Sequence, residues 1–310
     1  MGHSFVRAGP FKVSVLAADS MGVRSLATLV DACGTLIGLD LGASLAPRRY
    51  GLPPHELELK ALERAMESIR EAISEAEGIT ITHYHYDHFV RDEPQLYAGK
   101  RLFVKHPTQD INWSQRLRAR RFLLQQGVEK SASVSYADSA SFTLGSASLE
   151  FSEPVWHGEP GTPVGRVLMV KVSCGDEHVI FASDVQGPAD PAAVQRLTSW
   201  AGARVLIISG PPTYFAGFKV PVEAVQAGLD GLRQLVRARV AETIVVDHHL
   251  LRDLNFSERL RDHYELARQV GVRLVNAAEL MGVELNQLEA RRRELWGRKG
   301  GEEGGEEDYD

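Results

Sequence analysis

Four side chains that commonly bind metals lie within six residues of one another: His83, His85, Asp87 and His88. The apolar run before them, at 79–82, predicts a β-strand, so the chain leaves a sheet here and a tight loop can turn these side chains toward one point. His83 and His85 are expected on one side, because strand-like backbone alternates its side chains. Imidazole and carboxylate ligands suit zinc or another borderline divalent cation. The alternative is a polar loop that only caps the strand, and the density of ligand-type residues disfavours it.

The elements that must position this loop follow an order that occurs twice along the chain: strands, helix, strands. The first run predicts strands at 11–17, 23–30, 35–40, 79–82 and 102–104, with helices at 55–76 and 112–126. The second predicts strands at 141–144, 148–152, 166–173, 178–183, 205–209, 243–247 and 272–275, with helices at 191–200, 222–239, 257–269 (capped by Ser257) and 277–296. This order favours two packed sheets with helices outside, in one domain of two similar halves over residues 1–300.

The composition is that of a soluble globular protein. Of 310 residues, 44% are hydrophobic and 25% are charged, which excludes collagen, a long coiled coil and wholesale disorder. No apolar stretch approaches the length of a membrane span, and the start of the chain has no hydrophobic signal region. We therefore expect a cytoplasmic protein with no membrane partner. Cys33 and Cys174 are too few for a disulfide framework, and we interpret them as small strand residues without a redox role.

The net charge of −6 comes entirely from the last ten residues. Residues 301–310 carry six acidic side chains and no base, and their Gly/Glu composition predicts a solvated, disordered tail. The rest of the chain is neutral overall. Such a body has no field that would favour nucleic acid or an anionic membrane, so a small-molecule substrate is favoured over nucleic acid.

The histidine-rich loop resembles the H-x-H-x-D-H motif of the metallo-β-lactamase superfamily, and candidates for the other motifs of that family follow in its order. Asp40 in LIGLDLG resembles the first motif, and His157 in PVWHGEPG resembles the third. Asp184 in IFASDVQG resembles the fourth, and His248 or His249 in IVVDHHLL the fifth. The resemblance covers residues 11–275 and implies a four-layered αββα sandwich.

Three stretches resemble an archaeal group of metal-dependent hydrolases within this superfamily more closely. They are DSMGVRSLATLV, LGASLAPRRYGLPP and DHHLLRD. This closer resemblance implies a fold and a chemistry but no particular substrate.

The family resemblance implies a ligand set for two metals, most simply two zinc ions per chain, with Mn²⁺ or Fe²⁺ as alternatives. His83, His85 and His157 would hold the first metal. The second would be held by Asp87, His88 and either His248 or His249, with Asp184 bridging the two. Neighbouring histidines of a strand point apart, so only one of His248 and His249 is expected to bind directly, and which one stays open. Asp40 would contact the substrate or support a ligand from behind, unless it only caps its strand.

This ligand set implies hydrolysis, with Asp87 and Asp184 as the catalytic carboxylates. Two nearby dications can share a hydroxide that attacks a carbonyl or phosphoryl centre and can stabilise the oxyanion that forms. We therefore expect a binuclear hydrolase of an ester, lactone, thioester or phosphoester. One alternative is an RNA or nucleotide phosphodiesterase, and another is a metal-binding scaffold without turnover.

Spacing separates the chain from three branches of the superfamily. The flavodiiron oxidoreductases place glutamate where His85 stands, and the RNA-processing nucleases insert a large domain between the fourth and fifth motifs. His248 follows Asp184 by only 64 residues, which leaves no room for such an inserted domain. The common β-lactamases carry cysteine at the position of Asp184.

Two groups of arginines are candidates for binding an anionic substrate. Arg48 and Arg49 follow Asp40 and could line the cleft, where guanidinium groups suit phosphate or carboxylate. The alternative is a structural loop held by salt bridges. A second run, at 116–121, carries four arginines on a predicted helix, which is typical of a solvated face but could also reach an anionic substrate.

Overall fold

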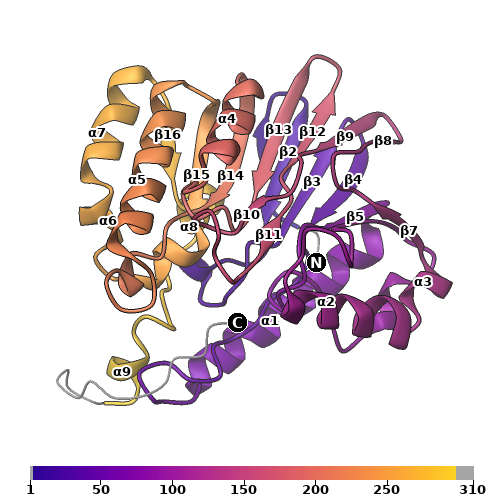
Figure 1. The fold of residues 1–310 in the computed structure, drawn as a ribbon, viewed down its shortest axis with the longest axis horizontal. Helices are drawn as coiled ribbons and strands as arrows, with labels where there is room; N and C mark the ends of the chain where they lie inside the picture. Colours follow the sequence, from indigo (N-terminus) through magenta and orange to yellow (C-terminus); the bar gives the residue numbers. More distant parts are fainter. Residues whose placement is uncertain (1–2, 298–310) are drawn as a thin grey trace.

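The computed structural model, which describes residues 3–297, contains two mixed sheets of seven strands each. The sheets lie face to face, and helices cover their outer faces (Figure 1). This arrangement confirms the four-layered αββα sandwich that the sequence predicts.

Each sheet combines an antiparallel meander with a set of parallel strands. The first sheet is ordered β1 (Val6–Ala8), β2 (Phe11–Val15), β3 (Thr28–Ala32), β4 (Thr35–Leu39), β5 (Gly78–Ile81), β6 (Arg101–Val104) and β7 (Ser133–Tyr136), parallel from β4 onward. The second is ordered β16 (Arg273–Val275), β15 (Ala241–Asp247), β14 (Ala203–Ser209), β13 (Glu177–Ala182), β12 (Val170–Cys174), β9 (Ala147–Phe151) and β8 (Ser141–Leu144), parallel from β13 to β16. The two sheets therefore repeat one plan of strands.

The helices that cover the first sheet are α1 (Glu56–Glu75), α2 (Trp113–Arg120) and α3 (Val128–Ser131), and a π-helical turn, Arg121–Gln125, continues α2. Those of the second half are α4 (Pro191–Ser199), α5 (Val222–Arg237), α6 (Phe256–Arg259), α7 (Arg261–Val270), α8 (Ala277–Met281) and α9 (Arg292–Leu295). The helix α1 begins where the sequence predicts, because His55 and Glu58 form a reciprocal capping box at its start.

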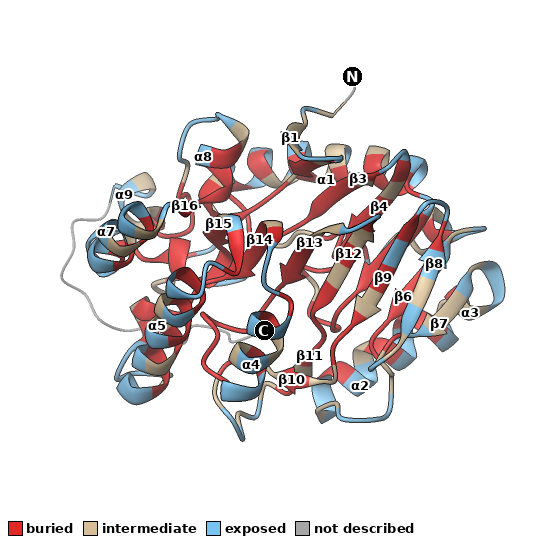
Figure 2. Cartoon of the chain, turned by 90° about the horizontal axis from the view of Figure 1, so that it is seen from above, coloured by how far each residue is buried: buried red, intermediate tan, exposed pale blue. Residues whose placement is uncertain are grey.

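The hydrophobic core has three layers that match this architecture. Between the sheets, Val13 and Val30 of the first pack with Val172 and Phe181 of the second. One outer cluster lies between the first sheet and α1, and another between the second sheet and the helices α4, α5 and α7. Figure 2 shows the same division, with buried strands inside and exposed faces on the outer sides of the helices.

The C-terminal ends of the parallel strands of both sheets carry the chemistry-bearing residues of the sequence. Asp40 follows β4, His83 comes two residues after β5, Asp184 two residues after β13, and His248 directly after β15. Asp40, Asp184 and His248 have left-handed backbone, with φ of 47°, 58° and 62°. Such strain in residues other than glycine concentrates at functional sites, where it redirects side chains as the chain leaves a sheet.

The predicted helix over 277–296 is wrong. The helix α8 ends at Gly282, whose left-handed backbone (φ 66°) caps it. The chain then runs without regular structure until α9, and Gln287 donates a hydrogen bond of 2.6 Å to the carbonyl of Leu251 on the way. The prediction that Ser257 caps a helix over 257–269 is also wrong, because α6 begins at Phe256 and is separated from α7 at Leu260.

The two cysteines form a disulfide, which corrects the expectation that they are unlinked strand residues. Cys33 lies in the turn between β3 and β4 of the first sheet, and Cys174 ends β12 of the second, with their Cα atoms 6.0 Å apart. The bond therefore joins the two sheets at the end of the strands.

Within residues 3–297, no helix combines the length and the apolar character that a bilayer span requires. The predicted acidic tail at 301–310 lies outside the described residues, so its disorder stays a prediction.

Candidate metal centre

Eight buried histidine and aspartate side chains gather at the edge where the strands of both sheets end. Their ligand atoms form overlapping groups, each with all atoms within 4.8 Å of one another. They are His83, His85, Asp87, His88, His157, Asp184, His248 and His249, which are the residues predicted as ligands from the sequence. Asp40 adjoins them through His83 and His88.

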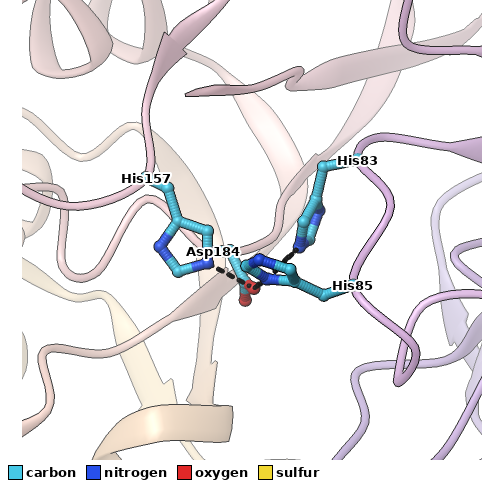
Figure 3. Close-up of side chains that lie close together, drawn as sticks. All are labelled: His83, His85, His157 and Asp184. Atoms are coloured by element: carbon cyan, nitrogen blue, oxygen red, sulfur yellow. Dashed lines mark hydrogen bonds and ion pairs between the residues drawn. The ribbon is translucent and has the colours of Figure 1, made fainter. Parts of the chain in front are cut away.

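Three histidines surround one oxygen of Asp184 (Figure 3). Oδ2 of Asp184 lies 3.0 Å from Nε2 of His83, 3.0 Å from Nε2 of His157 and 3.9 Å from Nδ1 of His85. The loop after β5 supplies His83 and His85, while His157 follows the short strand β10 (Val155–Trp156), which pairs with β11 (Arg166–Val167). The structure thus brings together the predicted residues of the first site.

A second group of side chains, Asp87, His88 and His248, also adjoins Asp184. Nε2 of His88 and Nε2 of His248 lie 3.5 Å from the two oxygens of Asp87. Nε2 of His248 also lies 3.2 Å from Oδ1 of Asp184, and Nε2 of His88 lies 3.3 Å from Oδ2. The carboxylate of Asp184 therefore faces both groups, with a different oxygen toward His248 than toward His83 and His157.

Both His248 and His249 point into the site, although strand alternation would turn them apart. The strand β15 ends at Asp247, and residues His248–Arg252 form a 3-10 turn, so the alternation does not apply to them. The buried carboxylate of Asp247 accepts hydrogen bonds from the backbone of His248 and of Ala277, which holds the turn. Nε2 of His249 lies 3.7 Å from Oδ1 of Asp184, farther than that of His248.

Asp40 supports a histidine from behind, one of the two roles expected for it. Its Oδ2 lies 3.1 Å from Nδ1 of His88, and its two oxygens accept hydrogen bonds from the backbone nitrogen and the hydroxyl of Thr82. Gly42 lets this loop pass close to the histidine loop, because a Cβ at Gly42 would collide with the backbone nitrogen of Phe89. Asp40 thus holds Nδ1 of His88, and Nε2 of the same ring faces the other ligand-type residues.

Asp19 and Arg252 support His248 in the same way, and the sequence did not reveal them. Oδ2 of Asp19, in the 3-10 turn Asp19–Met21, lies 2.8 Å from Nδ1 of His248. Nε of Arg252 donates to Oδ1 of Asp19 at 2.8 Å, and Nη2 of Arg252 lies 3.9 Å from Oδ2 of Asp87. Both residues occur in stretches that carry the family resemblance, DSMGVRSLATLV and DHHLLRD, but no spacing rule pairs positions so far apart.

The arrangement of ring nitrogens fits a bound metal. Nδ1 of His157 lies 3.2 Å from Nε2 of Gln186, so here too the nitrogen away from the centre has a partner. Nε2 of His88, of His157 and of His249 is buried and lies near a carboxylate oxygen of Asp184 without forming a hydrogen bond to it. Buried polar atoms without partners are rare and costly, whereas metal-binding histidines typically hold the second ring nitrogen in a hydrogen bond.

The protonation states also fit a divalent cation. Burial opposes ionisation of Asp184 and Asp87, but His88 and His248 outweigh it and lower the pKa of each carboxyl below its usual range. Burial lowers the pKa of His85 to about 4. At neutral pH the carboxylates are thus ionised and His85 is neutral, as metal ligands must be.

His88 lies between carboxylates, with Nδ1 3.1 Å from Oδ2 of Asp40 and Nε2 3.3 Å from Oδ2 of Asp184. Burial lowers the pKa of His88, but the carboxylates of Asp184 and Asp87 overcome this and raise it well above its usual range. The surrounding carboxylates thus favour a positive charge at this place, which a divalent cation would supply.

The two arginines proposed to line the cleft occupy different environments. Arg49 is buried, with Nε 4.0 Å from a carboxylate oxygen of Glu289 and its guanidinium 4.3 Å from the ring centre of Tyr214. This placement agrees with the alternative of a loop held by ion pairs. Arg48 is exposed.

A cavity of about 320 Å³ adjoins the first histidine group. Its lining includes His85 of the metal centre, Gln186, which contacts His157, and Arg118 from the arginine run at 116–121. The remaining lining residues are Asn112, Ser114, Glu159, Thr162, Pro163, Val164, Lys219 and Val220.

Comparison with known proteins gives close relatives over nearly the whole chain. The chain is 50% identical to a UPF0282 protein of Aeropyrum pernix over 296 residues, which covers 94% of this chain and 100% of the relative. It is 40% identical to a UPF0282 protein of Methanopyrus kandleri over 301 residues, covering 92% of this chain and 99% of the relative. No family model matches the chain.

Solved structures similar to this chain have the metallo-β-lactamase fold. The metallo-β-lactamase fold protein YhfI from Bacillus subtilis aligns with a TM-score of 0.50 at 14% identity, covering 86% of this chain and 96% of its own. An isothiocyanate hydrolase from Delia radicum gut bacteria aligns with a TM-score of 0.51 at 13% identity, covering 82% and 94%. At these identities the likeness establishes the fold.

Proposed function

The chain belongs to the UPF0282 family and has the metallo-β-lactamase fold, and on that premise we propose that it is a metal-dependent hydrolase of small molecules with a two-metal site. The proposed metal is zinc, with Mn²⁺ or Fe²⁺ as alternatives. The observation that carries the proposal is the position of Asp184, whose two oxygens lie within 3.0–3.2 Å of histidines from both groups.

His83, His85 and His157 would hold the first metal. Asp87, His88 and His248 would hold the second, and Asp184 would bridge them. We assign His248 rather than His249 because Asp19 holds His248 from behind and Asp87 faces it. When bound, two such cations lower the pKa of a shared water and stabilise an oxyanion, which is the chemistry of hydrolysis.

The protein's own residues would prepare this site before any substrate arrives. Asp87 and Asp184 are ionised, so they offset the mutual repulsion of two dications. Asp40, Asp19 and Gln186 fix the rings of His88, His248 and His157 from behind. Preorganised ligands of this kind need no rearrangement on binding, and substitution of such supports typically weakens metal binding tenfold to a hundredfold.

The adjoining cavity supports a small-molecule substrate over a nucleic acid. At about 320 Å³ it lies at the small end of ligand pockets, which measure roughly 300–1,000 Å³. It would present an ester, lactone, thioester or phosphoester group of a small molecule to the metals beside His85. The proposed location of the protein is the cytoplasm.

A direct experiment is to load the protein with zinc and screen it against all four substrate classes. His83→Ala should lose metal and turnover together, whereas His106→Ala, which removes a histidine outside the cluster, should keep both. A folded wild-type protein that takes up no metal would contradict the proposal. Full metal content with no turnover on any class would favour the scaffold alternative instead.

A further inference from the structure

Both halves of the fold contribute to the cavity beside His85. Asn112 caps α2, and Ser114 and Arg118 lie in its first and last turns, in the first half of the fold. Gln186, Lys219 and Val220 come from the second half, and the segment 159–164 closes the wall between them. A molecule in this space would lie against both halves and against a histidine of the metal centre.

The wall of the cavity is fixed by side-chain hydrogen bonds. The amide of Asn112 donates to the carbonyls of Pro163 and Val164, at 2.8 and 2.7 Å. Buried Gln115 donates to Val164 at 2.9 Å, and its Oε1 accepts a hydrogen bond of 3.0 Å from the backbone of Tyr84, within the histidine loop. The wall is therefore tied to the metal centre itself, so the pocket is formed in advance of binding.

Arg118 brings a positive charge to this wall in a defined position. Its guanidinium lies 4.6 Å from the ring centre of Tyr86, and Tyr86 stands between His85 and Asp87 in the histidine loop. The neighbouring Arg120 is exposed and does not line the cavity. The ring of Tyr86 therefore holds Arg118, and not Arg120, beside the histidine loop.

Lys219 brings a second positive charge from the other half of the fold. Its ammonium lies 5.3 Å from the ring centre of buried Phe215, and its backbone nitrogen donates to the carbonyl of Phe215 at 3.1 Å. The cavity is also lined by an acidic side chain, that of Glu159. Two cationic side chains and one carboxylate thus line a small space next to His85.

We propose that the substrate carries an anionic oxygen group, a carboxylate or a phosphate, which Arg118 and Lys219 bind while the bond to be hydrolysed lies beside His85. This inference rests on the proposed hydrolase function and names its substrate class. Guanidinium and ammonium groups bind such anions through charge-assisted hydrogen bonds, which are stronger than neutral ones. Glu159 opposes the anion and limits its affinity by charge repulsion.

The test is calorimetric binding of three small probes to the zinc-loaded protein. Benzylphosphonate and phenylacetate carry the two candidate anions and contain no bond to hydrolyse, and benzyl alcohol is the neutral comparison. Arg118→Gln and Lys219→Gln should each weaken binding of the preferred anion roughly fivefold to tenfold. Glu159→Gln should strengthen it, and Arg120→Gln, an equal change of charge on the same helix, should leave it unchanged. Benzyl alcohol should respond to none of them.

Preference for benzylphosphonate would assign a phosphate group to the substrate, and preference for phenylacetate a carboxylate. Equal anion affinity in wild type, Arg118→Gln and Lys219→Gln would overturn the inference, because the anion would then bind the metals alone. Zinc content and turnover are measured on the same samples. If both are present while the charge variants have no effect, the hydrolase proposal stands and the substrate class is wrong. If affinity follows the charges but no zinc is bound, the anion site stands and the hydrolase proposal fails.

Discussion

Asp19 lies 2.8 Å from Nδ1 of His248, which joins a turn after the second strand of the chain to the turn that follows β15. Arg252 binds the same carboxylate, and its Nη2 lies 3.9 Å from Oδ2 of Asp87. Three residues from distant parts of the sequence thus set the orientation of one proposed ligand. The proposed second metal position would depend on these contacts, because an imidazole that is free to rotate binds metal less tightly.

Asp19→Asn should weaken binding of the second zinc by about tenfold to a hundredfold and leave the first unchanged. Asparagine keeps the shape of the side chain but removes the charge that orients both His248 and Arg252. Zinc affinity, measured by competition with a chelator, checks this. Asp262→Asn is the control, because it removes an aspartate that pairs with an arginine on the surface, Arg233. Two unchanged zinc affinities in Asp19→Asn would show that Asp19 does not position His248.

The irregular segment before α9 should contribute strongly to stability through Glu289. Arg24 donates two hydrogen bonds to this buried carboxylate, at 2.7 and 2.9 Å. Breaking a buried ion pair costs about 3–5 kcal/mol, since the remaining charge stays buried without its partner. Glu289→Gln should therefore lower the melting temperature at pH 7 by several degrees. Glu294→Gln, in an exposed pair with Arg291, should have little effect.

The effect of Glu289→Gln should depend on pH. Burial raises the pKa of Glu289, but Arg24 and the other nearby arginines outweigh it and hold that pKa below its ordinary value of 4.5. A carboxyl with a lowered folded-state pKa stabilises fully above the unfolded pKa and loses this contribution as the pH falls. The difference in melting temperature between wild type and variant should thus be largest near neutral pH and shrink below about 4.5. Both proteins are measured with a chelator present, so that release of metal does not contribute. A difference that is constant from pH 7 to pH 3 would rule this account out.

The Cys33–Cys174 disulfide should stabilise the fold, because it links positions 141 residues apart and restricts the unfolded chain. Loss of such a link typically costs about 2–5 kcal/mol. Cys33→Ser and reduction of the wild-type protein should lower the melting temperature equally. Reductant should not lower the melting temperature of the variant further. Equal melting temperatures with and without reductant would contradict the prediction.

The architecture and the ligand cluster could be predicted from the sequence because both depend on local patterns. Apolar runs of strand length locate the strand ends, and the ligand residues follow within two residues of those ends, as at His83 and Asp184. Parallel strands end at one edge of a sheet, so residues at several ends meet there. These local patterns do not show that the edges of the two sheets meet in one site. That prediction rested on the family resemblance.

The supporting contacts could not be predicted because they join distant parts of the chain. Asp19, Arg252 and Gln186 are ordinary polar residues in sequence, and only the packing of the two sheets brings them to the histidines. The helix predicted over 277–296 was wrong for a related reason. Its apolar and charged residues suit a helix, but Gly282 ends α8, and buried contacts of Gln287 and Glu289 hold the following segment in another conformation.

The central claim is that Asp184 bridges two metals, and the zinc content of Asp184→Asn tests it most directly. Asparagine keeps the shape but removes the charge that offsets repulsion between two dications, whereas His83, His85 and His157 still form a site of their own. After loading and removal of free zinc, elemental analysis should give about two zinc ions per chain for the wild type and about one for Asp184→Asn, with the fold intact. Two zinc ions in the folded variant, or a single one in the wild type, would contradict the account.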